Sequence, residues 1–247
     1  MEAWRERCAL EPKLTLVRRG TSLGSIDVGA AADLGIAVAN TPGVNSPHVA
    51  QFAIETLGLD VPLAEQTEIG SDRIGSDQVG SDRIGSEQAA AKAVVIGSGS
   101  VGGFVIAAMR RAGLEPTVVN RSPQSPSLAA ALRGATHVAV CAATSAEPII
   151  STEHVDALLE GPPRTIKICS VSRPEAFSID AIMSIAQQAE HAVALRFDYG
   201  DSILAPTREL VDRQGVKERV TWSSVAMASE ACKRDMDEAV LRLLARH

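Results

Sequence analysis

The run "AKAVVIGSGSVGGFVIAAMRRAGLEPTVVNRSP", residues 91–123, carries the clearest structural pattern of this sequence. It begins with a short apolar run, passes through a glycine-rich turn into a helical pattern, and ends with a second apolar run. Gly97, Gly99 and Gly102 have the spacing G-x-G-x-x-G directly after the first run. A strand, a glycine turn, a helix and a second strand in this order predict a dinucleotide-binding βαβ unit.

Each glycine of this motif has its own physical reason. Gly97 permits the tight turn, Gly99 lets the backbone approach a pyrophosphate, and Gly102 lets the helix pack closely on the strand. The first N–H groups of the helix have no partner within it, and the helix dipole favours negative charge there. We therefore predict that these glycines, with Ser100 and Val101, bind the phosphates of a dinucleotide.

The end of the second strand indicates which dinucleotide is bound. NAD-binding versions carry an Asp or Glu near this point, which accepts hydrogen bonds from the ribose 2′-hydroxyl. No acidic residue lies between Glu115 and Glu147. Asn120, Arg121 and Ser122 stand there instead, and a guanidinium can pair bidentately with a phosphate. The sequence therefore predicts NADP(H) as the cofactor; the alternative for Arg121 is a solvated loop arginine.

The remaining pattern predicts the fold class. Short apolar strands that alternate with helices are typical of a parallel, doubly wound sheet of the Rossmann type. The sequence predicts strands at residues 14–18, 36–40, 93–97, 115–120, 137–142, 165–171, 192–197 and 219–223. It predicts helices at residues 26–34, 46–57, 101–112, 127–133, 152–160, 178–189, 207–212 and 228–245. Ser46 as N-cap and Pro47 at the first helical position mark one helix start clearly.

A five-residue unit repeats four times from Gly70 to Ala89, as "GSDRI GSDQV GSDRI GSEQA". A period of five matches neither a helix nor a strand. We expect either a solvated low-complexity linker or a small ordered element with its Ile and Val residues packed inward. We favour the linker, and we predict that it spans residues 61–90 between two domains.

Composition excludes several classes of protein. The chain has 247 residues, is 45% hydrophobic and 3% aromatic, and carries a formal net charge of -6, which argues against nonspecific nucleic-acid binding. The four cysteines form no CxxC pair and predict reduced thiols in a cytoplasmic protein without a metal site. The longest uncharged run, 93–109, is interrupted by glycines and does not predict a membrane span.

Three further segments carry a family resemblance. "GSIDVGAAADLGIAVANTPGVNSPHVAQ" (24–51), "TIKICSVSRPEAFSIDAI" (165–182) and "RVTWSSVAMASEACKRDM" (219–236) resemble segments of the D-isomer-specific 2-hydroxyacid dehydrogenases. The resemblance implies a reduced substrate segment at 1–60, on which the C-terminal helix 228–247 packs, and an NADP-binding domain at 91–227. It also implies a homodimer that acts on a small molecule.

The resemblance assigns functions to particular residues. It places the substrate carboxylate on a loop whose residues match Gly20, Thr21, Ser22 and Leu23. It implies that Arg173 holds the substrate's carboxylate and carbonyl, and that Asp198 lies near the nicotinamide. His48 belongs to a substrate-side motif, where it is either a substitute acid or a helix-surface histidine. The cofactor site is completed by Ala143, Thr144 and Ser170.

The sequence departs from the family pattern where the catalytic acid is expected. The family's Pro-His pair aligns with Ser223 and Ser224, and Asp201 is the nearest acid to the place of the supporting glutamate. The catalytic set is therefore Arg173, Ser224 and Asp201. General acid catalysis contributes about 10²–10⁴-fold in rate. Ser224 thus leaves three alternatives open: a slower carbonyl reductase, a reductase of an activated substrate such as an iminium or enone, or a non-catalytic NADP(H)-binding protein or inactive partner subunit. The leading hypothesis is an NADPH-dependent reductase of a small carbonyl or imine that carries a carboxylate.

Overall fold

The computed structural model describes residues 14–21, 23–61, 91–144, 147–198, 209, 219–223, 226 and 228–245. The chain divides into two compact units, residues 1–48 with 227–247 and residues 49–226. This division falls inside the helix that begins at Ser46. The predicted domain limits at residues 1–60, 61–90 and 91–227 stay a prediction. The pentad repeat lies outside the described residues, and so does the predicted helix 207–212 apart from Glu209.

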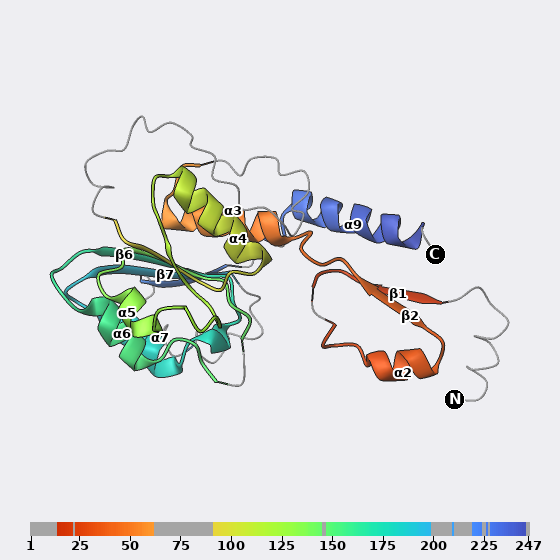
Figure 1. The fold of residues 1–247 in the computed structure, drawn as a ribbon, viewed down its shortest axis with the longest axis horizontal. Helices are drawn as coiled ribbons and strands as arrows, with labels where there is room; N and C mark the ends of the chain where they lie inside the picture. The colour runs from red at the N-terminus through yellow and green to blue at the C-terminus, as the bar shows by residue number, and fades with distance from the viewer. Residues whose placement is uncertain are drawn as a thin grey trace. The chain divides into compact units, whose positions relative to one another are not determined.

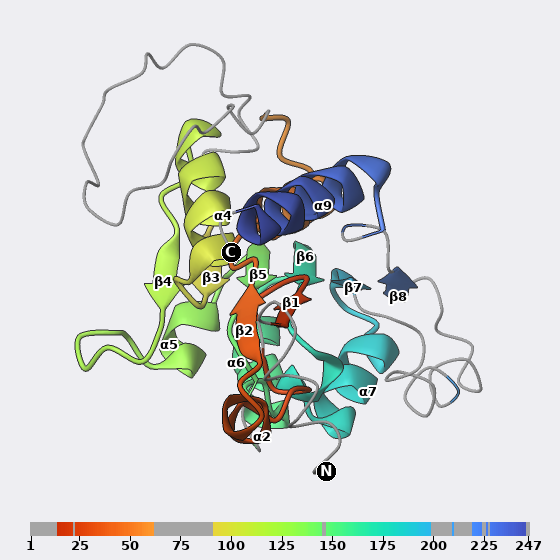
Figure 2. The same cartoon turned by 90° about the vertical axis from the view of Figure 1, so that its right-hand side faces the viewer.

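A six-stranded parallel sheet forms the centre of the larger unit. Its strands follow the order β4-β3-β5-β6-β7-β8, which can be followed across Figure 2. They span β3 Ala93–Ile96, β4 Thr117–Val119, β5 His137–Val140, β6 Thr165–Ser170, β7 Ala192–Asp198 and β8 Val220–Ser223. The chain reverses its direction of travel across the sheet after β4, which is the arrangement of a doubly wound fold. The predicted Rossmann-type class is confirmed.

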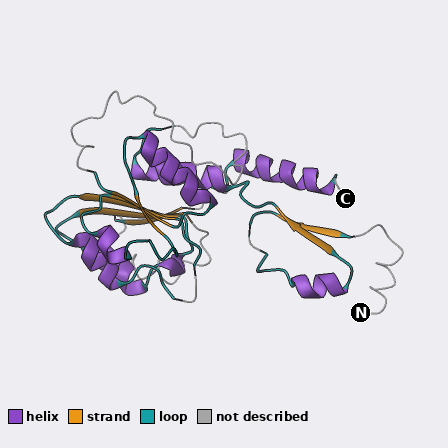
Figure 3. Ribbon diagram, in the orientation of Figure 1, coloured by secondary structure: helices purple, strands orange, loops and turns teal. Residues whose placement is uncertain are grey.

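Helices cover both faces of this sheet (Figures 1 and 3). One face carries α3 (Ser46–Leu57) and α4 (Ser100–Arg111), and the other carries α5 (Leu128–Leu132), α6 (Thr152–Leu159) and α7 (Ile179–Gln187). Side chains of a strand point alternately to the two faces, so β3 must be apolar throughout. Ala93 and Val95 pack in the cluster under α3 and α4, while Val94 and Ile96 pack in the cluster with α5–α7.

The smaller unit contains a two-stranded parallel sheet and two complete helices among its described residues. Strand β1 (Thr15–Arg18) pairs with β2 (Ala37–Asn40), and α2 (Val28–Asp33) connects them. Asp27 caps α2 by accepting a hydrogen bond from the Ala30 amide at 2.9 Å. Helix α9 (Glu230–Leu244) belongs to the same unit and contacts β1. None of the helices in the described part of the chain is long and apolar enough to cross a membrane.

Candidate cofactor and substrate site

The glycine turn after β3 is fixed by close packing. Gly97 has a φ of +96°, and a Cβ at this residue would lie 2.7 Å from the backbone of Ala142, beyond the end of β5. Gly102 lies in the first turn of α4, where a Cβ would overlap the carbonyl oxygen of Gly97. Both residues must therefore be glycine for α4 to start where it does.

Gly99 has a different environment from these two glycines. It is the N-cap of α4 with a φ of -71°, and a Cβ there would meet no atom within 4 Å. No side chain of the described residues caps the helix, and its first turn contains no acidic residue. The first N–H groups of α4 thus have no capping side chain among the described residues, and the positive end of the helix dipole lies beside them. These features fit the pyrophosphate of the predicted dinucleotide.

The loop after β4 is tied to the glycine turn by Asn120. Its side-chain amide donates to Ser98 Oγ at 3.2 Å, and its Oδ1 accepts from the Ser122 amide at 2.8 Å. The Asn120 amide also donates to Ser125 Oγ at 3.0 Å. Arg121, which lies between Asn120 and Ser122, is exposed and has no hydrogen-bond or ion-pair partner within the described segments. Its guanidinium is therefore available on a loop that is held against the glycine turn.

The residues after β5 and β6 differ in exposure. Ala143 is exposed and Thr144 is half-buried, whereas Ser170 is fully buried and its hydroxyl has no hydrogen-bond partner in the part of the chain that the structure describes. Ser172 Oγ donates to the carbonyl of Ala142 at 2.6 Å, which joins the two strand ends. Contacts of the cofactor with these residues stay a prediction.

Arg173 lies on a short, well-anchored turn at the carboxyl edge of the sheet. It precedes a single 3₁₀ turn, Pro174–Ala176, and its carbonyl accepts the Ala176 amide at 2.9 Å. The turn ends at Phe177, whose ring packs edge-on against Phe197 with centroids 5.3 Å apart. Arg173 itself is exposed and makes no ion pair with Glu175 or with any other described residue. A simple surface pair on this turn therefore does not explain the arginine.

Asp198 at the end of β7 is held by the strand that follows. Its Oδ1 accepts from Ser223 Oγ and from the Ala226 amide, both at 3.3 Å, and only 8% of the residue is exposed. This carboxylate joins β7 to the end of β8, which is a structural task that the sequence did not indicate. Ser224 and Asp201, two members of the predicted catalytic set, lie outside the described residues.

The predicted substrate loop in the smaller unit is a turn fixed by the residues after β2. Gly20 has a φ of +99°, and its amide donates to the buried Thr41 Oγ1 at 2.8 Å. Asn40 Nδ2 donates to the Thr21 carbonyl at 2.6 Å, and the Leu23 carbonyl accepts the Ile26 amide at 2.9 Å. Ser22 lies outside the described residues. A meeting of this loop with Arg173 stays a prediction.

Neither the cysteines nor the histidines of the described residues form a further reactive centre. Burial raises the pKa of the Cys141 thiol to about 12, so it is not a nucleophile at neutral pH. His154 serves as the partner of Ser151 at the start of α6, and His191 accepts from the Arg164 amide at 3.3 Å. No group of three or more His, Cys, Asp or Glu side chains in the described ranges could hold a metal ion.

Comparison with known proteins gives the family. The family model described as "D-isomer specific 2-hydroxyacid dehydrogenase, catalytic domain" matches residues 9–245. The chain belongs to this family. It is thus a member of a family of NAD(P)-dependent oxidoreductases, and the resemblance found in the sequence is confirmed. A search of curated proteins found no match.

Solved structures show the same fold. The apo-structure of D-lactate dehydrogenase from Escherichia coli is similar, with a TM-score of 0.68 and 14% identity, over 98% of this chain and 77% of that chain. D-lactate dehydrogenase from Aquifex aeolicus with NAD and lactic acid gives 0.65 and 16%, over 94% and 75%. An NADPH-dependent glyoxylate/hydroxypyruvate reductase from Sinorhizobium meliloti with NADP and malonate gives 0.61 and 17%, over 91% and 71%.

Two contacts at this site were missed by the sequence analysis. The Asn120–Ser98 hydrogen bond connects residues 22 positions apart, and the Gly20–Thr41 hydrogen bond connects residues 21 positions apart. The available signal was a polar residue at the end of a predicted strand, as Asn120 is, or directly after one, as Thr41 is. The sequence could not name the partner, because the partner depends on how the strands pair.

Proposed function

We propose that this family member is an NADPH-dependent reductase of a small carbonyl or imine substrate that carries a carboxylate. One observation carries the proposal. The uncapped N-terminus of α4 and two arginines without ion-pair partners among the described residues, Arg121 and Arg173, follow the carboxyl ends of strands in one parallel sheet. Open α/β sheets bind their ligands outside the carboxyl ends of the strands.

The cofactor half of the proposal rests on α4 and the β4–α5 loop. The amides at the start of α4 would receive the pyrophosphate, and Gly99 leaves the space for it. Arg121 and Ser122 would receive the 2′-phosphate, on a loop that Asn120 holds in place. Similar structures include one with NAD and one with NADP, so the preference comes from this chain's own Arg121. When bound, the cofactor supplies a hydride to the substrate carbon.

The substrate half of the proposal rests on Arg173. Its planar guanidinium can hold a carboxylate and a carbonyl oxygen together, which orients the substrate and polarises the carbonyl. Backbone amides of the Gly20–Leu23 loop would also bind the carboxylate, as the family resemblance implies. A serine hydroxyl is a poor proton donor, so Ser224 favours slow turnover of 2-keto acids or reduction of an activated iminium or enone. We expect a cytoplasmic homodimer.

Ser223-Ser224 in place of the family's Pro-His also favours a second candidate, an NADP(H)-binding protein without turnover or an inactive partner subunit. Both candidates require NADP(H) binding and differ only in whether Arg173 acts on a substrate. They can therefore be separated by one set of measurements on the same protein.

The decisive experiment follows NADPH oxidation by the purified chain against a panel of 2-keto acids, cyclic imines and enones. Arg173→Ala should keep NADPH binding and lose turnover by about a hundredfold or more. Arg133→Ala is the matched control, since this exposed arginine of the same unit pairs with Glu160 at 2.8 Å, away from the glycine turn. NADPH binding without turnover of any compound would refute the reductase and leave the binding protein. Absence of NADPH binding would refute both.

A further inference from the structure

Ser98 lies between the first two glycines of the glycine turn (residues 97–99), at a position for which the dinucleotide motif sets no requirement. The residue is exposed, and its Oγ lies 3.2 Å from Nδ2 of Asn120, which directly follows β4. This hydrogen bond joins the glycine turn to the loop that carries Arg121 (residues 120–125, the Arg121 loop). The pyrophosphate site at the start of α4 does not account for it, because Asn120 belongs to the other loop.

The pairing of β3 with β4 brings the glycine turn and the Arg121 loop together. Ile96 and Val119 are partners in the sheet, and the Gly97 amide donates to the Val119 carbonyl at 2.8 Å. Both segments then leave the sheet at its carboxyl edge. The hydrogen bond between Ser98 and Asn120 is therefore a side-chain contact that continues the pairing of the two strands beyond the sheet.

The Asn120 side chain bonds at both of its ends. The Ser122 backbone N–H can only donate, so the Asn120 atom that lies 2.8 Å from it must be the oxygen. The side-chain nitrogen therefore faces Ser98, whose hydroxyl oxygen accepts. Arg121 lies between Asn120 and Ser122 in the chain. One side chain thus links the glycine turn to the backbone on both sides of Arg121.

The Arg121 loop also closes on itself. The Asn120 amide donates to Ser125 Oγ at 3.0 Å, and the Ser125 amide donates to the Ser122 carbonyl at 2.9 Å. These contacts give the loop its shape, but they lie within it and do not fix it relative to the glycine turn. The hydrogen bond to Ser98 supplies a direct attachment between the two. It therefore helps to set where the backbone of Arg121 lies relative to the start of α4.

We propose that Ser98 is a positioning residue for cofactor choice, which acts through Asn120 on Arg121. The proposal rests on the NADP(H) site of the proposed function. A dinucleotide whose pyrophosphate binds at the start of α4 brings its adenosine ribose to the end of the second strand. A guanidinium holds a phosphate bidentately only in a defined geometry, so Arg121 must keep its place relative to the pyrophosphate site. Ser98 maintains that place, and NADH, which has no 2′-phosphate, does not depend on it.

Titration of NADPH and NADH into the purified full chain, followed by the fluorescence of the reduced nicotinamide, tests this role. Ser98→Ala removes the acceptor and should weaken NADPH binding by about three- to tenfold, which is the range of one neutral hydrogen bond. The affinity for NADH should change by less than about twofold, because NADH lacks the group that Arg121 would hold. Ser98→Thr keeps the hydroxyl and should retain the NADPH affinity. Ser98→Ala combined with Asn120→Ala should bind NADPH no more weakly than Asn120→Ala alone, because the two residues share one contact.

Ser178→Ala is the matched control. Ser178 Oγ accepts from the Ala181 amide at 3.2 Å at the start of α7, which covers the opposite face of the sheet from α4 (Figure 1). The variant removes one serine hydroxyl and one hydrogen bond of the same unit. It should leave the affinities for both cofactors unchanged.

The outcomes separate this role from the proposed function. If the wild type binds NADPH no better than NADH, or if Arg121→Ala keeps the preference, the 2′-phosphate site is refuted and the role of Ser98 with it. If Arg121→Ala abolishes the preference while Ser98→Ala binds NADPH with wild-type affinity, only the role of Ser98 is overturned. Equal losses of NADPH and NADH binding in Ser98→Ala, or an equal loss of NADPH binding in Ser98→Thr, overturn it as well.

Discussion

Gly102 lies directly against the carbonyl of Gly97, so the first turn of α4 touches the turn that precedes it. A Cβ on Gly102 would overlap that carbonyl oxygen, whereas a Cβ on the neighbouring Gly103 would meet no atom within 4 Å. Two adjacent glycines of one helix therefore carry opposite requirements. Gly102 is required by the packing, whereas Gly103 has no packing role and only lowers the stability of the helix interior.

This difference gives the first prediction. Gly102→Ala should lower the free energy of unfolding by about 1–3 kcal/mol, because the backbone must shift to admit the methyl group. Gly103→Ala should raise it by up to about 1 kcal/mol, because alanine loses less conformational freedom in a helix. Urea denaturation of the two variants beside the wild type measures both changes. Equal effects of the two substitutions would contradict the packing read from the structure.

The second prediction is that Gly99→Ala affects NADPH binding but not the stability of the fold. Its φ of -71° suits any residue and its Cβ would enter open space, so the free energy of unfolding should change by less than about 0.5 kcal/mol. The same methyl group would stand where the pyrophosphate is proposed to approach the helix. NADPH binding, followed by the fluorescence of the reduced nicotinamide, should therefore weaken by about tenfold or more. If this variant binds NADPH with wild-type affinity, the cofactor phosphates do not bind at the start of α4.

Elements with strong local signals could be predicted from the sequence. The α3 helix begins at Ser46 and ends before Gly58, which has the left-handed φ of +72° that the predicted stop requires. The β3 strand is apolar throughout because both of its faces are covered, and this run was plain in the sequence. The 3₁₀ turn Pro174–Ala176 was not predicted, since it depends on a bridge between Ile150 and Phe177 that no local pattern encodes.

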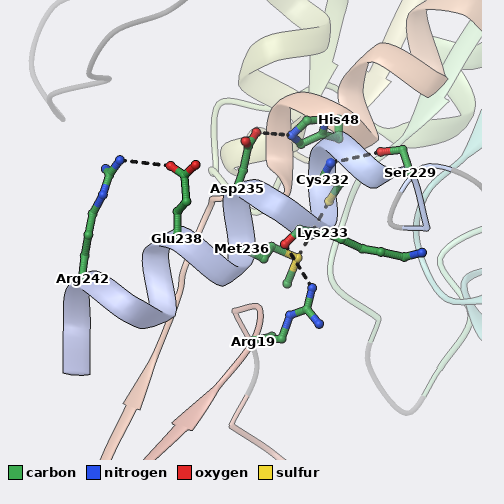
Figure 4. Close-up of polar contacts among 9 residues, drawn as sticks. All are labelled: Arg19, His48, Ser229, Cys232, Lys233, Asp235, Met236, Glu238 and Arg242. Carbon is green, nitrogen blue, oxygen red and sulfur yellow. Dashed lines mark hydrogen bonds and ion pairs between the residues drawn. The ribbon is translucent and has the colours of Figure 1, made fainter. Parts of the chain in front are cut away.

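The candidate site likewise combines a local pattern that could be predicted with contacts that could not. The glycine spacing is local, and the structure gives Gly97 and Gly102 the close packing that the sequence predicted, whereas the role of Gly99 stays a prediction. Partners distant in sequence could not be predicted. Glu175 is the acidic residue nearest to Arg173 in the sequence, yet these two described residues form no ion pair with each other. His48 has its partner 187 positions away on α9, where Asp235 Oδ2 lies 2.7 Å from His48 Nε2 (Figure 4), and nothing near either residue indicates that contact.

The third prediction concerns cofactor choice. Arg121→Ala should weaken NADPH binding by about tenfold to a hundredfold, since a hydrogen bond to a charged group contributes about 1.5–3 kcal/mol. NADH lacks the 2′-phosphate, so its affinity should change little. Arg133→Ala, an exposed arginine already paired with Glu160, should leave both affinities unchanged. Titration of both cofactors into the three proteins measures this, and equal losses for NADPH and NADH in Arg121→Ala would refute the phosphate role.

The last prediction concerns stability at alkaline pH. Burial is the main cause that raises the pKa of the Cys169 thiol; the nearby Cys141 and Asp198 raise it further, while the charge of Arg196 acts against it. Part of the Cys141 residue reaches the surface, whereas Cys169 is fully buried, so Cys169 gives the cleaner test.

In the unfolded chain a thiol ionises near about pH 8.5, while the folded chain keeps Cys169 protonated. The unfolded state therefore binds fewer protons above this pH, and the free energy of unfolding must fall as the pH rises, by up to about 1.4 kcal/mol per pH unit for this thiol. Cys169→Ala should remove that part of the slope, even though the smaller side chain lowers stability at every pH. Ser172→Ala is the control, because it removes a buried hydroxyl bonded to Ala142 without removing a titrating group. Urea denaturation between about pH 7.5 and 9.5 under reducing conditions measures the slopes. If Cys169→Ala retains the wild-type slope, the thiol is not held protonated by the fold.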